Sequence, residues 1–180
     1  MRHRATERFR GDRARRTLIA SEIVSAEDLS EPIIRRKKLS ARTAGTMKTD
    51  IDFGEYPSIA TDEPIAHGGT GEGASPLQTV LGALCGCEAV TFNRTAADLD
   101  FSYEGIEFEG EYTLDIRGRM GVEGVRPHFQ TIRVQATVTT DESEERLAEV
   151  VEETERRCPV FNLVVDAGVK TQMLWVRQPS

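Results

Sequence analysis

Three cysteines, Cys85, Cys87 and Cys158, are the side chains of this chain that are best able to carry out covalent chemistry. A thiolate can attack the O–O bond of a peroxide, and a second thiol can then condense with the resulting sulfenic acid. Buried cysteines also pack as small hydrophobic side chains, which is their commoner use. An odd number of cysteines in 180 residues does not suit a secreted disulfide scaffold. Reactive thiols and structural thiols are therefore the two interpretations that composition and spacing leave open.

The same residue types do not make a convincing zinc site. Cys85 and Cys87 stand two apart on a predicted helix, roughly 200° around its axis, so they face different sides. Adding Cys158 and either His67 or His128 would give four ligands, but their spacing matches no zinc module. We therefore expect no bound metal ion.

The first two cysteines lie on the strongest predicted helix, which begins after Ser75 and runs to about Leu99. Ser75 is a good N-cap, Pro76 suits the first helical position, and Gln78 completes a capping box. The faces outside the apolar stripe carry mostly small or apolar side chains until Arg94, so we expect this helix to be central and buried. Its apolar stripe consists of Leu77, Val80, Leu81 and Leu84.

The third cysteine stands at the end of a second predicted helix, over residues 141–157. Pro159 cannot continue that helix smoothly, but it suits the first position of a further short helix. Cys158 would then lie at a helix N-terminus, where the dipole favours a thiolate. The inner face of the second helix consists of Leu147, Val150, Val151, Thr154 and Cys158.

Three segments alternate between apolar and polar residues, which is typical of strands with one buried face. They span residues 47–53, 106–116 and 132–138, and residues 169–176 are predicted to form a final strand. Residues 54–74 read as turns and residues 117–127 as a connecting loop. The glycines of residues 69–73 do not predict a phosphate-binding loop, because no Lys-Ser/Thr pair ends the run and Glu72 lies within it. The element order predicts an α+β fold with helices packed against an antiparallel sheet.

The formal net charge of −7 combines two regions of opposite sign. Residues 1–48 hold 13 basic and 6 acidic side chains, whereas residues 49–180 hold 10 basic and 24 acidic ones. So acidic a body repels phosphate backbones, and we expect no nucleic-acid partner. No apolar run approaches the roughly 18 residues of a membrane-spanning helix, so we expect no membrane partner. The absence of an export signal and the free thiols favour a cytoplasmic location.

We expect residues 1–40 to form a basic, flexible N-terminal arm and residues 41–180 to form the folded domain. Seven arginines fall within the first 16 residues, and a second basic cluster occupies residues 35–38. Such a composition favours a solvated arm. Docking of the arm onto an acidic surface, either of a partner or of the domain itself, is the alternative.

Two motifs carry a resemblance to a known family. The run SPLQTVLGALCGC at residues 75–87 resembles the cysteine-bearing helix of the OsmC/Ohr family, the osmotically inducible protein C and organic hydroperoxide resistance proteins. The later RCPV at residues 157–160 resembles that family's second cysteine motif, and TDEP at residues 61–64 is similar to the OsmC-like branch. The likeness spans about residues 42–177 and does not include the arm.

The resemblance implies an OsmC-like fold, with antiparallel sheets packed on two central helices and two chains intertwined as a homodimer. It implies thiol-dependent reduction of organic hydroperoxides at the subunit interface, without metal, haem, flavin or other cofactor. By position, Cys87 matches the peroxidatic cysteine, whose sulfenic acid Cys158 would resolve as a disulfide. A dithiol reductant of the lipoyl type would restore both thiols. No role follows for Cys85, which is an additional cysteine.

The sequence departs from the family pattern beside the first cysteine motif. The peroxidases of the family carry a Glu directly after the helix-opening proline, where this chain has Leu77. Glu72 and Glu88 are candidate substitutes, although Glu88 without an Arg beside it would raise the pKa of a neighbouring thiol. Arg42 and Arg94 are candidates for the arginine of the family. A second hypothesis therefore stays open, a non-catalytic dimer of the same fold that binds a hydrophobic small molecule at its interface.

Overall fold

The computed structural model describes residues 31–180, and its compact unit runs from Lys38 to Ser180. Residues 31–37, which precede this unit, are exposed chain without a helix or strand. Most of the predicted arm, residues 1–40, lies outside the described residues, so its docking stays a prediction. Within residues 31–180, no helix is both long enough and apolar enough to cross a membrane.

Three strands form the main sheet, in the order β4-β5-β6. They are β4 (Gly105–Leu114), β5 (Phe129–Thr139) and β6 (Lys170–Gln178). One face of β5 is buried, at Ile132, Val134, Ala136 and Val138, whereas Arg133 and Gln135 on the other face are exposed. The alternation read from the sequence is thereby confirmed.

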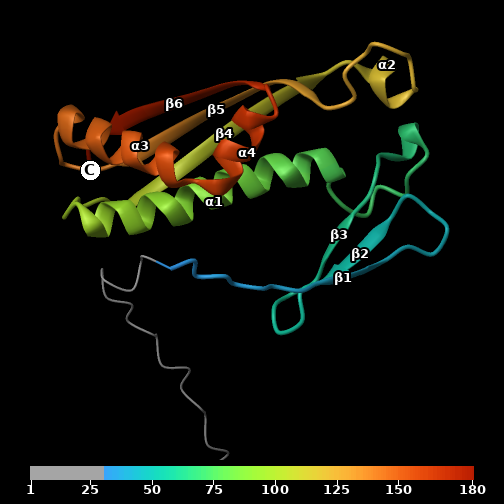
Figure 1. Ribbon diagram of the computed structural model, residues 1–180, viewed down its shortest axis with the longest axis horizontal. Coiled ribbons are helices and arrows are strands. Elements are labelled where there is room, and N and C mark those ends of the chain that lie inside the picture. The colour runs from blue at the N-terminus through green and yellow to red at the C-terminus, as the bar shows by residue number, and fades with distance from the viewer. Residues whose placement is uncertain (1–30) are drawn as a thin grey trace, which may run out of the picture. The chain divides into compact units, whose positions relative to one another are not determined.

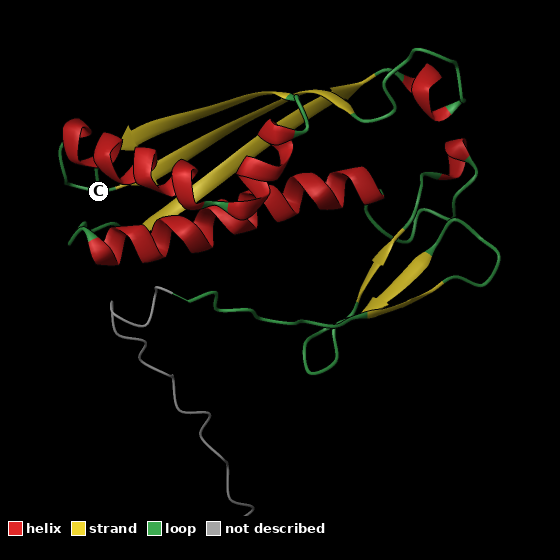
Figure 2. Ribbon diagram, in the orientation of Figure 1, coloured by secondary structure: helices red, strands yellow, loops and turns green. Residues whose placement is uncertain are grey.

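Helices cover one face of this sheet (Figures 1 and 2). They are α1 (Pro76–Asp98), α3 (Glu144–Arg157) and α4 (Pro159–Asp166). The predicted α+β class is confirmed, as are both long helices and the short helix that begins at Pro159. Since α1 and α3 pack on each other as well as over the sheet, they are the elements that place the cysteines.

We expected a purely antiparallel sheet, but the main sheet contains both antiparallel and parallel strand pairs. β4 and β5 are antiparallel, with Ile106 opposite Val138, but β5 and β6 are parallel, with Val134 opposite Met173. The reason lies in the connection, because α3 and α4 carry the chain back along the sheet before β6 starts. A helical crossover of this kind joins parallel strands.

The N-terminus of α1 has the predicted capping box. The backbone N–H of Gln78 donates to Ser75 Oγ at 3.2 Å, and the backbone N–H of Ser75 donates to Gln78 Oε1 at 3.0 Å. The helix ends at Asp98 with Leu99 as its C-cap, as the sequence predicts. Such a cap contributes about 1 kcal/mol, and here it also fixes the register of the helix that carries Cys85 and Cys87.

Two clusters of apolar side chains hold α1 to the sheet. The ring of Phe92, which belongs to one of these clusters, is fully buried and stacks on Trp175 of β6, with ring centroids 5.3 Å apart. The first cluster consists of Leu84, Phe129, Ile132, Val134, Val164 and Val169, and the second of Phe92, Ala96, Phe101, Val138, Leu147 and Val150. Both clusters combine residues of helices and of the sheet, so the long helix is fixed along its length.

The prediction that α1 is buried all round is wrong for the single chain. One face is exposed, including Val80 at 41% and Val90 at 55%. Gly82, Ala83 and Gly86 are exposed on this helix as well. A single sheet with α3 and α4 covers only part of a helix of this length, so the small and apolar residues on the remaining face have no cover.

A smaller antiparallel sheet precedes α1, in the order β1-β2-β3. Its strands are β1 (Ser40–Arg42), β2 (Thr49–Asp52) and β3 (Ile59–Thr61). The predicted strand at residues 47–53 corresponds to β2, but β3 lies in the stretch that we expected to be turns. Three residues are too few to reveal an alternation, which explains why the sequence missed β1 and β3.

Two short helices also lie in segments expected to be irregular. They are η2 (Ile65–His67) and α2 (Ile116–Arg119). Ile116, expected to end a strand, instead begins α2, because the Asp115 carboxylate accepts a hydrogen bond from the backbone N–H of Arg117 and so caps the turn.

The glycine-rich loop at residues 69–73 closes around a carboxylate of the chain itself. Asp62 is fully buried, and one of its oxygens accepts from Thr70 Oγ1 at 2.6 Å and from the backbone N–H of Thr70 at 2.9 Å. The same oxygen accepts from Glu72 N, and the other from Glu63 N. The backbone N–H groups of Thr70 and Glu72 bind Asp62, so they are not free to bind an added phosphate.

We predict that Asp62→Asn lowers the melting temperature by several degrees at pH 7 but not at pH 2. The hydrogen bond from Thr70 and those from the backbone lower the pKa of Asp62 to about 2, against the opposing effect of burial. The unfolded value is about 3.9, so this stabilisation is complete above pH about 4 and is lost as the pH falls through about 2. Thermal melts from pH 7 to pH 2 test this, with the exposed Asp166→Asn as control. A constant difference between Asp62→Asn and wild type across that range would contradict it.

Candidate functional site

Cys158 lies at the sharp turn between α3 and α4. It caps both helices, with φ −72° and ψ 114°, and Pro159 begins α4 directly after it. The Asn162 side chain donates to the carbonyl of Cys158 at 2.8 Å and so fixes the turn. Cys158 is fully buried. Its thiol therefore points into the protein interior from a rigid corner.

Cys87 of α1 lies near the turn that holds Cys158. It is half-buried, and its thiol is near enough to Cys158 to raise the pKa of the Cys158 thiol. Neither cysteine forms a disulfide in the structure. Two thiols that are far apart in the sequence are thus neighbours, which is the arrangement that disulfide formation requires.

Cys85 does not belong to this site. It packs among the residues of the first apolar cluster, beside Leu84, on the side of α1 that faces the sheet. Burial raises its pKa, and the charge of Glu88 raises it further. Its environment is that of a structural cysteine.

Glu88 is the unexpected member of the site. It follows Cys87 on α1 and is fully buried, and neither of its carboxylate oxygens has a hydrogen-bond partner of ordinary geometry. Burial raises the pKa of Glu88 to about 7. A contact with the Cys158 thiol acts in the opposite direction, and the charge of Glu155 raises the pKa further. A buried carboxyl group without a cation is costly, so its presence needs a reason.

The surroundings of Cys158 favour the thiol over the thiolate. Burial is the largest cause and raises the pKa of Cys158 to about 12. The backbone N–H of Phe161 lowers the pKa, as a helix N-terminus should, but Glu88 and the hydrogen bond with Cys87 raise it. The expectation that the dipole of α4 makes Cys158 a thiolate is therefore wrong for the reduced protein, because desolvation outweighs the dipole.

The other charged candidates lie elsewhere. Glu72 pairs with Lys48 at 2.5 Å beside the Asp62 loop. Arg42 on β1 and Arg94 on α1 are exposed, and neither forms an ion pair with the described residues 31–180. Glu88 is consequently the charged side chain that contacts the cysteine pair in the described part of the chain.

From the sequence, Glu88 was expected only as a candidate for the glutamate of the family, and its burial was not predicted. The informative signal was its position in the buried stripe of α1, four residues after Leu84 and four before Phe92. Further buried oxygens lie on the same two helices, since the hydroxyls of Thr95 on α1 and Thr154 on α3 have no partner either. The seam between α1 and α3 is thus more polar than the core on either side of it.

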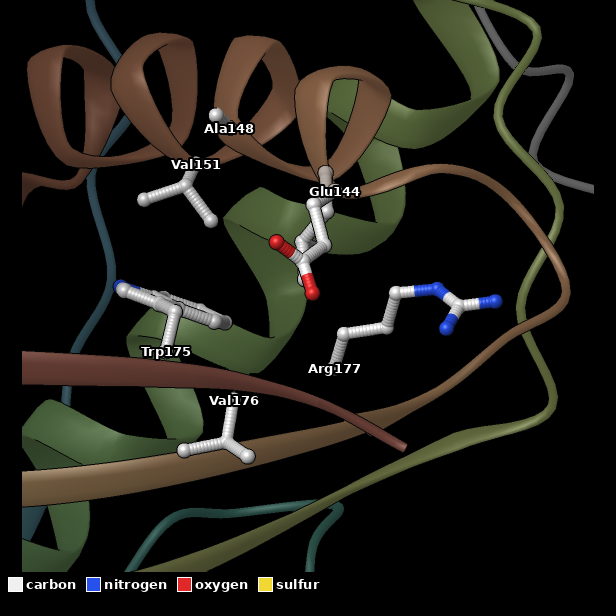
Figure 3. A pocket seen from close by; sticks show the side chains of 7 residues that line it. Glu144, Ala148, Val151, Trp175, Val176 and Arg177 are labelled. Atoms are coloured by element: carbon white, nitrogen blue, oxygen red, sulfur yellow. The ribbon is translucent and has the colours of Figure 1, made fainter. Parts of the chain in front are cut away.

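No cluster of three or more His, Cys, Asp or Glu side chains suited to a metal ion occurs within residues 31–180. A hollow of about 430 Å³ lies between α3 and β6 (Figure 3). Trp175, Val176, Ala148 and Val151 give it apolar walls, and Glu144 and Arg177 supply its charged groups. No cysteine lines it, so it is separate from the thiol pair.

The fold and the site define a class of α+β protein. In this class a long central helix presents one thiol to a second thiol, which lies at a turn between two helices. The family model described as OsmC-like protein matches residues 69–173, and the chain belongs to this family. No match was found among the curated proteins.

Solved structures share the fold at low sequence identity. The OsmC-like protein of Mycoplasma pneumoniae is 17% identical, with a TM-score of 0.66 over 82% of this chain and 99% of that one. A Legionella pneumophila structure described as an organic hydroperoxide resistance protein OsmC is 15% identical, with a TM-score of 0.58 over 81% and 99%. The organic hydroperoxide resistance protein OhrB of Bacillus subtilis is 22% identical, with a TM-score of 0.54 over 78% and 98%.

Proposed function

We propose that this protein is a thiol-dependent peroxidase that reduces organic hydroperoxides through Cys87 and Cys158. The observation that carries the proposal is the meeting of the two thiols, one from α1 and one from the turn between α3 and α4. The names of the Legionella and Bacillus proteins, which refer to organic hydroperoxide resistance, support the choice of substrate.

The proposed cycle has three steps. The Cys87 thiolate attacks the distal oxygen of the hydroperoxide, the O–O bond breaks, and the alkoxide takes a proton and leaves as alcohol. Cys158 then attacks the sulfur of the Cys87 sulfenic acid, which forms a disulfide and releases water. A dithiol in a reducing compartment such as the cytoplasm reduces the disulfide and restores both thiols.

The exposed face of α1 supports a further part of the proposal, that the protein acts as a homodimer. Val80, Gly82, Ala83, Gly86 and Val90 form a strip of small and apolar side chains beside Cys87. Small residues permit close approach of a second helix, and covering such a strip removes apolar surface from water. In such a dimer the half-buried Cys87 would lie at the subunit interface.

We predict that Cys158→Ser stops turnover but still reacts with one equivalent of peroxide. Cys87 should then remain as a sulfenic acid, because no second thiol contacts it. Cumene hydroperoxide added to the reduced protein, followed by dimedone trapping and mass spectrometry, checks this, with Cys85→Ser as the control that keeps turnover. Loss of two thiols per peroxide in Cys158→Ser would show that a different cysteine resolves the sulfenic acid.

One observation favours a second candidate function. The apolar hollow between α3 and β6 is large enough for a small molecule and contains charged groups from Glu144 and Arg177. A hydrophobic ligand that bound there without reaction would raise the melting temperature of wild-type protein and not that of Trp175→Ala. Peroxide turnover that requires Cys87 would exclude binding as the protein's sole function.

A further inference from the structure

We infer that Glu88 is the base that removes the proton from Cys158 as the disulfide forms, and the acid that returns it to the departing hydroxide. The inference rests on the proposed function and assigns a role to a side chain that the cysteine cycle alone does not explain. Three features carry it: the proximity of Glu88 to the Cys158 thiol, the complete burial of Glu88, and the lack of any hydrogen-bond partner for its two carboxylate oxygens.

The carboxyl group of Glu88 acts on two thiols, those of Cys85 and Cys158. Glu88 is adjacent to Cys87 on α1, and its carboxyl group lies near the thiol of Cys158, which is itself fully buried. Both carboxylate oxygens lack an ordinary hydrogen bond. A structural carboxylate in the interior would normally bind a cation or several donors. Glu88 has neither, so its lone pairs are free to accept the proton of the thiol.

The charged groups around Glu88 keep it available as a base near neutral pH. From α3, the charge of Glu155 acts on it, and the carboxylate of Glu155 accepts a hydrogen bond from Trp175 Nε1 at 3.0 Å. From the start of α4, the backbone N–H of Phe161 reaches the Cys158 thiol. The glutamates of β4 are exposed. Burial and Glu155 together raise the pKa of Glu88 to about 7, which is the range of an efficient general base.

The step balances without any further reactant. The Glu88 carboxylate takes the proton of the Cys158 thiol, and the sulfur of Cys158 attacks the sulfur of the Cys87 sulfenic acid. The S–S bond forms as the S–O bond breaks, so the Cys158 sulfur is oxidised and the Cys87 sulfur is reduced. The departing hydroxide receives the proton from Glu88 and leaves as water, which restores the carboxylate.

The environment of Cys158 makes such a base necessary. Its thiol is protonated at neutral pH, and the thiolate is the nucleophile. Waiting for spontaneous ionisation of so buried a thiol would make disulfide formation slow. The nearby Glu88 carboxylate can remove the proton from the Cys158 thiol as the sulfur attacks. The negative charge then moves from the Glu88 oxygen to the Cys158 sulfur, and no further charge has to be brought into the protein interior.

The test is Glu88→Gln in a single-turnover experiment. Reduced protein receives one equivalent of cumene hydroperoxide, and the Cys87 sulfenic acid and the Cys87–Cys158 disulfide are followed by rapid quench and mass spectrometry. We expect the sulfenic acid to form and its conversion to disulfide to slow by about 10²-fold or more. The opposite result is equally clear. If Glu88 only disfavours the thiolate of Cys158 by its charge, Glu88→Gln speeds disulfide formation and the inference is wrong.

Two controls make the result specific. Glu152→Gln removes an exposed carboxylate from the same helix that ends at Cys158, and should leave disulfide formation at the wild-type rate. Wild-type protein itself provides a test that needs no variant, because its rate of disulfide formation should rise to a plateau through pH about 7. A rate independent of pH between 6 and 8 would overturn the inference.

The outcomes separate the inference from the proposed function. If wild-type protein forms no sulfenic acid at Cys87, the proposed peroxidase cycle fails and the role of Glu88 fails with it. If the sulfenic acid forms and Glu88→Gln converts it to disulfide as fast as wild type does, the cycle stands and only the role of Glu88 is rejected.

Discussion

Replacing Cys87 by serine should abolish the reduction of cumene hydroperoxide, with a loss of rate on the order of 10³-fold or more. A serine hydroxyl is not ionised near neutral pH and cannot pass through a sulfenic acid, so the first bond of the proposed cycle cannot form. The half-buried position of Cys87 gives peroxide a route to this sulfur, whereas Cys158 is enclosed. The measurement is peroxide loss in the presence of excess dithiol.

Cys85→Ser is the matched control for this prediction. Cys85 lies on the same helix, but its side chain packs into the apolar cluster on the sheet side and does not contact the pair. We expect this variant to turn over peroxide and to lose some stability, because a hydroxyl replaces a half-buried thiol. If Cys87→Ser reduced peroxide as fast as wild type, the mechanism proposed here would be wrong.

The second large effect is on stability, and it also concerns Glu88. Glu88→Gln should raise the free energy of unfolding at pH 8 by about 3 to 4 kcal/mol. The folded pKa of about 7 lies above the unfolded value of about 4.3. Ionisation therefore destabilises the folded protein, beginning above pH about 4 and reaching its full size above pH about 7. Glutamine keeps the shape of the side chain and removes that charge.

Urea denaturation of both proteins at pH 4.5 and at pH 8 measures this difference directly. The gain from Glu88→Gln should be small at the lower pH and large at the higher one, while other acid-sensitive groups cancel between the two proteins. Exposed Glu152→Gln should show no such change. A gain of equal size at both pH values, or a loss at pH 8, would contradict the assignment of a buried, ionisable Glu88.

The higher stability and the slower disulfide formation that we expect of Glu88→Gln describe a conflict between stability and chemistry at one residue. A carboxylate held in the seam between α1 and α3 without a cation weakens the fold, and a variant without it should be more stable. Proteins commonly retain such costs at sites where function depends on them. The same variant is expected to resolve the sulfenic acid more slowly, so the gain in stability and the loss of rate should occur together.

The fold was predictable where local signals were strong. The capping residues Ser75, Pro76 and Gln78 predicted the start of α1, and the alternation of apolar and polar residues predicted β4 and β5. β1 and β3 are too short to carry a period. The parallel pairing of β5 with β6 depends on the path of α3 and α4, which no alternation within a single strand reveals.

The sequence pointed to a pair of cysteines, which the structure brings near each other, but it did not predict the environment of the pair. The two motifs pointed to Cys87 and Cys158, and their contact depends on how α1 packs against α3. The sequence suggested a thiolate at Cys158 from the helix dipole alone, whereas burial and Glu88 reverse the direction of the pKa shift. The burial of Cys158 arises from tertiary packing, so the residues next to it in the sequence do not predict its effect on the pKa.

The most direct test of the central claim is the identity of the disulfide formed in a single turnover. Reduced wild-type protein is treated with one equivalent of cumene hydroperoxide, alkylated, digested and mapped by mass spectrometry. We predict one linked peptide pair containing Cys87 and Cys158, with Cys85 recovered as an alkylated thiol. Three alkylated thiols, or a disulfide that contains Cys85, would contradict the account.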